Sequence, residues 1–159
     1  MDPSYISSVR PNILKQHFFK YKELSKETFL YHDCDIAFTR KPNFKKFLND
    51  DIWYLSDTNS YINYDYVISK GEDIYDRMCT IVGLDKTIPV KNNLHSGGAQ
   101  YLIKNVNYKF WSKVENDSER LYKEITFMNN EKINLDNSYH PLQIWCADMW
   151  AVLWNAWLF

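Results

Sequence analysis

Two aspartates separated by one residue, Asp33 and Asp35, form the strongest chemical pattern in the sequence. They follow the apolar run Thr28–Tyr31, whose residue types predict a buried strand. Two carboxylates at one strand end can reach the same hard cation, and Mg²⁺ and Mn²⁺ prefer such oxygen ligands. A divalent cation there would neutralise a diphosphate and stabilise it as a leaving group. The alternative is a solvated acidic turn, because this spacing is common.

A second candidate is the segment Ser96-Gly97-Gly98-Ala99-Gln100, which contains two of only four glycines in the chain. Adjacent glycines before a predicted strand indicate a close approach of the backbone to something else. That partner is either a ligand or the protein itself, in a tight turn or bulge. The segment matches neither GxxxxGK[ST] nor GxGxxG.

Two single residues add to these patterns. Asp148 is the only acid in the tryptophan-rich segment 141–159. Desolvation there would raise its pKa, which suits a general base, whereas the alternative is an acid that faces solvent. Arg10 begins the first predicted helix without an acidic neighbour in sequence. Its guanidinium and the helix N-terminus both suit a phosphate, and the alternative is a solvated surface arginine.

The four histidines are weaker candidates. His17 is predicted to pack on a helix, and His32 adjoins the aspartate pair, where it could support a metal ligand. His95 and His140 fall in predicted loops, where each could supply a third metal ligand or be solvated.

Length and composition restrict the class of protein. The chain has 159 residues, the size of one domain spanning 1–159, and its net charge of −1 gives no indication of a nucleic-acid partner. Twelve Tyr, nine Phe and six Trp favour stacking on a sugar or base, or a large aromatic core. The three widely spaced cysteines predict reduced thiols in a cytoplasmic protein. The start Met1–Ser8 is polar, and no apolar run is long enough to span a membrane.

Helical and strand patterns alternate along the chain, which predicts a layered α/β domain. The predicted helices are Pro3–Leu24, Asn43–Leu48, Asp65–Ser69, Asp73–Leu84, Asn107–Met128 and Pro141–Phe159. The predicted strands are Thr28–Tyr31, Ile36–Phe38, Ile52–Leu55 and Gln100–Ile103. Lys86–Ser96 and Asn129–Tyr139 are predicted loops.

These motifs together resemble the GT-A fold glycosyltransferases, in particular the galactosyltransferase-like group that includes glycogenin. Segments 8–14 (SVRPNIL) and 28–36 (TFLYHDCDI) resemble the family's arginine-bearing helix and the DxD strand that follows it. Segment 94–102 (LHSGGAQYL) is similar to its Asn-Ser-Gly strand, which lines the donor-sugar pocket. Segment 147–153 (ADMWAVL) is similar to its later Asp-Gln-Asp-x-Leu helix. The four matches cover most of the chain in the same order.

The resemblance implies a Rossmann-like sheet flanked by helices, Mn²⁺ or Mg²⁺ as cofactor, and a role for each matched residue. It assigns donor-substrate binding to Arg10, Asp33, Ser96, Gly97 and Gly98. It assigns metal binding to Asp33 and Asp35, with His140 as a third ligand that lacks the family's His-x-Gly context. It assigns catalysis to Asp148 and Gln100.

Two departures from the family qualify the expected function. Only about ten residues precede Arg10, so the usual N-terminal strands that bind the base are expected to be missing. The chain stops in the apolar run Trp157-Leu158-Phe159, where family members continue, which predicts truncation at both ends and self-association through the aromatic helix.

The expected function is transfer of a hexose from a nucleotide-diphosphate sugar, a UDP-sugar above all, to a hydroxyl of a glycan or protein acceptor. One alternative is a remnant of such a domain that binds a glycan or a partner without catalysis. Another is a metal-dependent phosphoesterase, which ranks last because such sites gather more acids and histidines.

Overall fold

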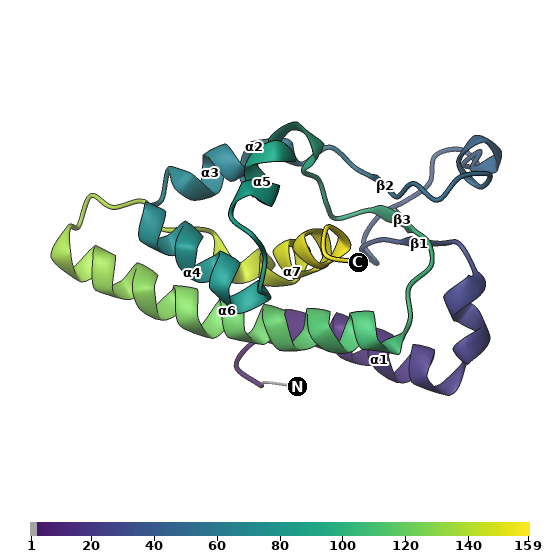
Figure 1. The fold of residues 1–159 in the computed structure, drawn as a ribbon, viewed down its shortest axis with the longest axis horizontal. Coiled ribbons are helices and arrows are strands. Elements are labelled where there is room, and N and C mark those ends of the chain that lie inside the picture. The colour runs from purple at the N-terminus through teal and green to yellow at the C-terminus, as the bar shows by residue number, and fades with distance from the viewer. Residues whose placement is uncertain (1–2) are drawn as a thin grey trace.

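The computed structural model describes residues 3–159, and Figure 1 shows their arrangement. Residues 1 and 2, which belong to the predicted domain and to its polar start, lie outside the described residues. The helices are α1 (Val9–Lys20), α2 (Asn59–Ile62), α3 (Tyr64–Ile68), α4 (Glu72–Val82), α5 (Thr87–Lys91), α6 (Tyr108–Leu135) and α7 (Ala147–Ala156). The strands are β1 (Phe29–Tyr31), β2 (Tyr54–Leu55) and β3 (Tyr101–Ile103). Short 3₁₀ turns are η1 (Ile6–Ser8), η2 (Lys22–Lys26), η3 (Lys45–Phe47), η4 (Asn93–His95) and η5 (Ile144–Cys146).

The long helix α6 is the element against which the other large helices pack. The side chain of Asn107 caps its start by accepting a hydrogen bond from the amide of Lys109 at 2.9 Å. Apolar residues recur along one face at helical spacing, so that α1, α4 and α7 all pack against it (Figure 1). Trp111, Leu121 and Ile125 on this face are fully buried, as their periodicity predicts.

Helix α7 lies in the centre of the core. Every residue from Ala147 to Asn155 is buried, and the large rings of Trp150 and Trp154 are among the most buried side chains in the domain. Its apolar side chains are therefore covered by packing within this chain, and the expected self-association stays a prediction. The described residues that stay exposed beyond it are Leu158 and Phe159.

The sheet is small and antiparallel, with the strand order β1-β3-β2. Phe29 is paired with Ile103, and Tyr54 is paired with Leu102. The predicted mixture of helices and strands is confirmed. Within residues 3–159 this three-stranded sheet is the whole of the strand structure, so the larger Rossmann-like sheet of the GT-A fold stays a prediction.

Four local predictions were wrong. The predicted loop Asn129–Tyr139 is helical in its first seven residues, because α6 continues to Leu135. Ile36–Phe38 is not a strand: within residues 3–159 it pairs with none of the three strands, and Phe38 is exposed. Segment 43–48 forms only the turn η3. The predicted loop Lys86–Ser96 contains α5, whose Pro89 lies in the first turn, where no intrahelical bond requires its missing N–H.

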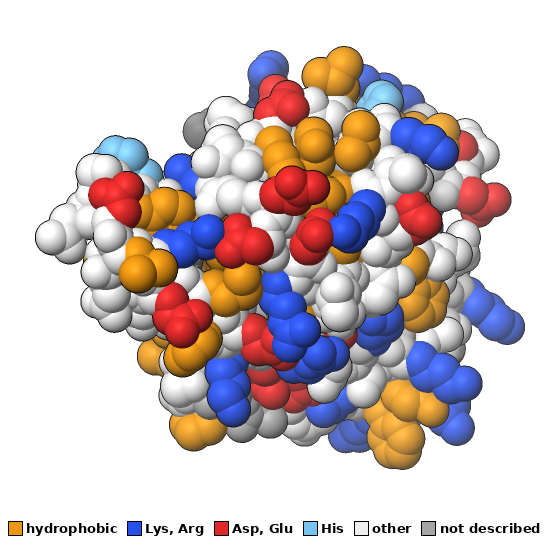
Figure 2. Space-filling view, turned by 60° about the vertical axis from the view of Figure 1, so that its left-hand side comes forward, with side chains coloured by type: hydrophobic (Ala, Val, Ile, Leu, Met, Phe, Trp, Pro, Cys, Tyr) orange, Lys and Arg blue, Asp and Glu red, His pale blue; other side chains and the backbone are white. Residues whose placement is uncertain are grey.

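The surface mixes charges of both signs. Figure 2 shows lysine and arginine side chains interspersed with aspartate and glutamate on one face, with small hydrophobic areas between them. No helix within residues 3–159 is long and apolar enough to cross a membrane. All three cysteines are free thiols, with Cys34 exposed and the other two buried.

Candidate functional site

The guanidinium of Arg10 joins two carboxylates from distant parts of the chain. Its Nη1 donates a short hydrogen bond to Asp33, which follows the end of β1, and its Nη2 lies 2.9 Å from Oδ2 of Asp148. Arg10 belongs to the first turn of α1, and Asp148 belongs to the first turn of α7. Three residues that the sequence predicts separately as site residues therefore form one cluster.

Asp148 is the deeply buried member of this cluster, with a side chain 2% exposed. Burial raises the pKa of its carboxyl, and the nearby positive charge of Arg10 opposes that rise. Its Oδ1 accepts a 3.0 Å hydrogen bond from the hydroxyl of Tyr5. The desolvation predicted for an acid among tryptophans is confirmed.

A surface cavity of about 480 Å³ opens beside the cluster. Arg10 and the segment from Tyr31 to Asp35 line it, together with the apolar side chains of Ile13 and Leu14. Asp35 is exposed on this wall, whereas the side chain of Asp33 is 35% exposed and held by Arg10. Burial also raises the pKa of the Tyr31 hydroxyl, so it stays protonated and neutral. The cavity thus offers two carboxylates and a guanidinium to a ligand.

The glycine pair permits a close approach to protein atoms. A Cβ on Gly97 would lie 2.5 Å from the carbonyl oxygen of Ser56, and one on Gly98 would lie 2.7 Å from Cε of Met149. Ala99 then adopts a φ of 63°, in the left-handed region, as the chain turns into β3. Of the two interpretations left open by the sequence, the tight turn accounts for this packing.

The other predicted site residues lie apart from the Arg10 cluster. Ser96 is buried and lines a different cavity, described below. Gln100 lies on the wall of a small hollow of about 160 Å³ beside Phe44 and Phe47. His140 is exposed in the loop after α6, next to Tyr139, whose hydroxyl bonds to the carbonyl of Lys70. In the part of the chain that is described, no three His, Cys, Asp or Glu side chains gather to hold a metal ion.

The aspartate pair still fits a divalent cation as a two-carboxylate site. Asp33 and Asp35 supply hard oxygen donors on one cavity wall, and Arg10 occupies only Oδ1 of Asp33. Mg²⁺ is commonly bound by one or two carboxylates plus substrate phosphates and water. The remaining ligands would then come from a bound diphosphate.

Sequence reasoning missed two residues whose side chains join distant segments, Tyr5 at this site and Lys104 at the far end of the loop between β1 and β2. Tyr5 lies 143 positions from the carboxylate that it bonds, and no local pattern marks it. Lys104 is 4% exposed, and its ammonium donates to the carbonyls of Phe47 and Asp50 and to the carboxylate of Asp50. A lysine directly after the buried strand β3 is a signal that could have identified it.

Comparison with known proteins adds no relative: the chain matches no protein-family model, no curated protein and no solved structure.

Proposed function

We propose that this chain carries the donor-binding region of a metal-dependent GT-A fold glycosyltransferase, which transfers a hexose from a nucleotide-diphosphate sugar, a UDP-sugar above all, to an acceptor hydroxyl. The observation that carries the proposal is the bridge from Arg10 to Asp33 and Asp148 at the edge of a cavity that Asp35 also lines. An arginine suited to bind phosphate, two carboxylates suited to bind a metal ion and a buried acid lie together there. The free thiols also favour a cytoplasmic location.

Each residue has a distinct role in this proposal. Asp33 and Asp35 would hold Mn²⁺ or Mg²⁺, which supplies charge neutralisation of the leaving diphosphate. Arg10 is half-buried, so its guanidinium can turn from the carboxylates to the phosphate oxygens. That movement uncovers Asp148, whose raised pKa suits it to hold a proton from a sugar hydroxyl.

A thermal-shift titration tests the donor site. The chain is titrated with Mn²⁺, UDP and GDP, singly and combined, alongside the double variant Asp33→Asn/Asp35→Asn. A ligand at about 100 times its Kd stabilises a native domain by about 2.7 kcal/mol, which a melting curve detects. We expect stabilisation that needs metal and nucleotide together and is lost in the double variant.

A matched control removes two negative charges elsewhere. Glu27→Gln/Glu131→Gln changes two exposed acids and should leave the ligand-induced shift intact. Equal loss in both double variants would mean that overall charge, and not the aspartate pair, governs binding. No shift with any combination in the unmodified chain would refute the donor site.

One observation favours the alternative of a non-catalytic binding domain. Arg10 already pairs with both Asp33 and Asp148 without a ligand, as in a structural ion cluster. Under this alternative, chelation of metals leaves glycan or partner binding unchanged, and UDP-sugar is not hydrolysed or transferred. A product assay with UDP-hexoses and Mn²⁺ distinguishes the two functions.

A further inference from the structure

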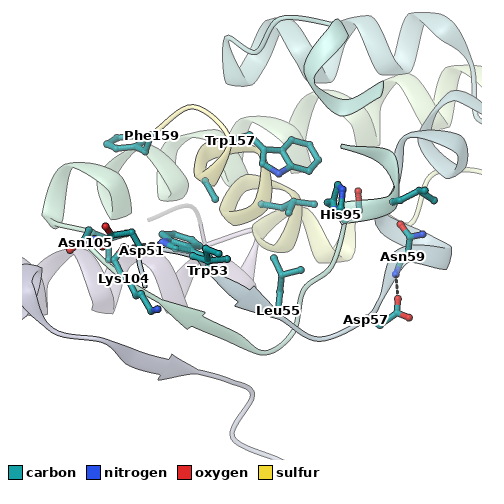
Figure 3. Close-up of a pocket in the computed structure, with 16 residues that line it drawn as sticks. Asp51, Trp53, Leu55, Asp57, Asn59, His95, Lys104, Asn105, Trp157 and Phe159 are labelled. Carbon is teal, nitrogen blue, oxygen red and sulfur yellow. Dashed lines mark hydrogen bonds between the residues drawn. The ribbon is translucent and has the colours of Figure 1, made fainter. Parts of the chain in front are cut away.

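A second cavity, of about 800 Å³, lies away from the Arg10 cluster (Figure 3). Its wall combines β2 and its flanks, the turn η4, the end of β3 and the last turn of α7. Helix α7 carries Asp148 in its first turn and Ala156 in its last, so the two sites are about 12 Å apart along the helix. This cavity is therefore a second site, independent of the aspartate pair.

Aromatic rings form much of the wall. Figure 3 shows Trp157, His95 and Leu55 around one part of the cavity and Trp53 on another. The indole N–H of Trp53 donates to the carbonyl of Lys104 at 2.9 Å, and its ring packs edge-on against Phe110, so its orientation is fixed. Leu94 at the opening is 80% exposed. The fixed ring of Trp53 and the ring of Trp157, beside an exposed leucine, suit the C–H face of a ring-shaped ligand.

The charges of the wall argue against an anionic ligand. The ammonium of Lys104 is fully engaged with the carbonyls and carboxylate of segment 45–51. The two acids, Asp51 and Asp57, are exposed at the rim. A phosphate would therefore meet negative charge without a free lysine or arginine to pair with it.

The polar groups suit hydroxyls better than a cation. Each rim carboxylate already accepts one hydrogen bond, from Asn105 to Asp51 and from the amide of Asn59 to Asp57. The exposed position of both acids screens their attraction for an amine. Their exposed carboxylates can still accept further hydrogen bonds, since each accepts only one, on Oδ1, from the described part of the protein. Such acceptors are complementary to sugar hydroxyls, which donate and accept.

We propose that this cavity binds a neutral saccharide, with Trp157 as the ring on which the sugar stacks. The inference stands without the donor site, because it uses none of its residues.

Saturation-transfer NMR on the full chain tests the inference in the presence of EDTA and without nucleotide. The probes are the methyl glycosides of glucose, galactose and mannose, N-acetylglucosamine, and neutral di- and trisaccharides of these sugars. We expect at least one to receive saturation, mainly at the C–H protons of one ring face. Trp157→Ala should weaken its binding by about tenfold or more.

Trp145→Ala is the matched control, because Trp145 is 62% exposed and does not line the cavity. The Trp145→Ala variant should bind the saccharide as tightly as the unmodified chain does. Leu94→Arg is a second test that avoids any folding defect, since it places a bulky charged side chain at an exposed opening and should also weaken binding. Circular dichroism melts establish that each variant folds.

Three results would overturn the inference. The first is that no neutral saccharide receives saturation. The second is that Trp145→Ala removes binding while Trp157→Ala and Leu94→Arg retain it. The third is that glucuronate, a sugar phosphate or tetramethylammonium binds more tightly than every neutral sugar. Because EDTA is present throughout, failure of the donor site leaves this result unaffected.

Discussion

The helical core and the segment 32–53 are held in place by different forces. In the core, α7 and the buried face of α6 join large apolar side chains in one continuous cluster. Segment 32–53, which connects β1 to β2, contains one short turn, and Phe38, Leu48 and Ile52 along it are exposed. Arg10 holds one end of it through Asp33, and Lys104 holds the other through Asp50.

This difference determines whether a mutation in each region unfolds the whole domain or opens the region locally. Apolar packing is shared among many neighbours, so damage to one core ring lowers the stability of the whole domain. The segment depends on a few charged contacts, so loss of one contact should release it locally. Mutations in the two regions therefore distinguish global unfolding from local opening.

The largest expected effect is in the core. Trp154→Ala removes a ring that is 1% exposed and should lower the free energy of unfolding by about 3–5 kcal/mol. Urea unfolding followed by circular dichroism measures the loss. Trp145→Ala changes an exposed ring and should stay within about 0.5 kcal/mol of the unmodified chain. Equal losses would show that α7 is not the centre of the core.

An intermediate effect is expected where the core meets the charged cluster. Tyr5→Phe removes the hydroxyl that donates to Asp148 and should cost about 1–3 kcal/mol at neutral pH. Tyr122 stacks on Tyr5 at 4.4 Å, and its hydroxyl bonds to nothing in the described part of the chain. Tyr122→Phe is therefore the matched control and should leave urea unfolding unchanged.

The pH dependence of the Tyr5→Phe variant follows from the raised pKa of Asp148. Because burial raises that pKa in the folded state, the associated stability is fully present below the ordinary value of 3.8 and is lost as pH rises through the folded value. Loss of the Tyr5 donor raises the folded pKa further. The deficit of the variant should therefore be small at low pH and grow as the pH rises; a deficit independent of pH would contradict the role of Asp148.

The smallest effect on overall stability is expected at Lys104. Lys104→Met keeps the length of the side chain but removes the ammonium that holds Asp50. Amide hydrogen exchange should accelerate in segment 45–51 and remain slow in α6. Equal acceleration in both regions would show that the segment opens only with the whole domain.

The titration of Asp50 provides a second readout of the same variant. Hydrogen bonds from Lys104 and Tyr54 lower the pKa of Asp50 from 3.8 to about 2. The stability linked to a lowered carboxyl pKa is present above 3.8 and is lost as pH falls through about 2. NMR titration of the carboxyl carbon should give a midpoint near 2 in the unmodified chain and a higher one in Lys104→Met.

Elements with strong local signals could be predicted from the sequence. The face of α6 follows from its helical period, and Gly83 ends α4 with a φ of 76°, as a glycine after a helix predicts. The short helix α5 could not be recognised, because five residues that include a proline carry no period. Segment 36–38 has strand-forming residues, yet pairing depends on a neighbour that local sequence does not specify.

The candidate site could be predicted in its members but not in their contacts. Residue type and local position predict Arg10, Asp33 and Asp148 as site residues one by one. A phosphate was the expected partner of Arg10, whereas its partners within the chain are two carboxylates. The approach of α1 to α7 depends on packing across α6, which residue spacing along the chain does not reveal.

The central place of β3 in the sheet has a consequence for synthesis on the ribosome. β1 and β2 each pair with β3 and not with each other, so neither has a partner until residue 103 has been made. The hydrogen bond from Tyr5 can form only later still, because its acceptor, Asp148, is synthesised after β3. Residues 29–100 are therefore synthesised before either strand of this sheet has its partner, so the sheet depends on contacts between distant segments, which form slowly.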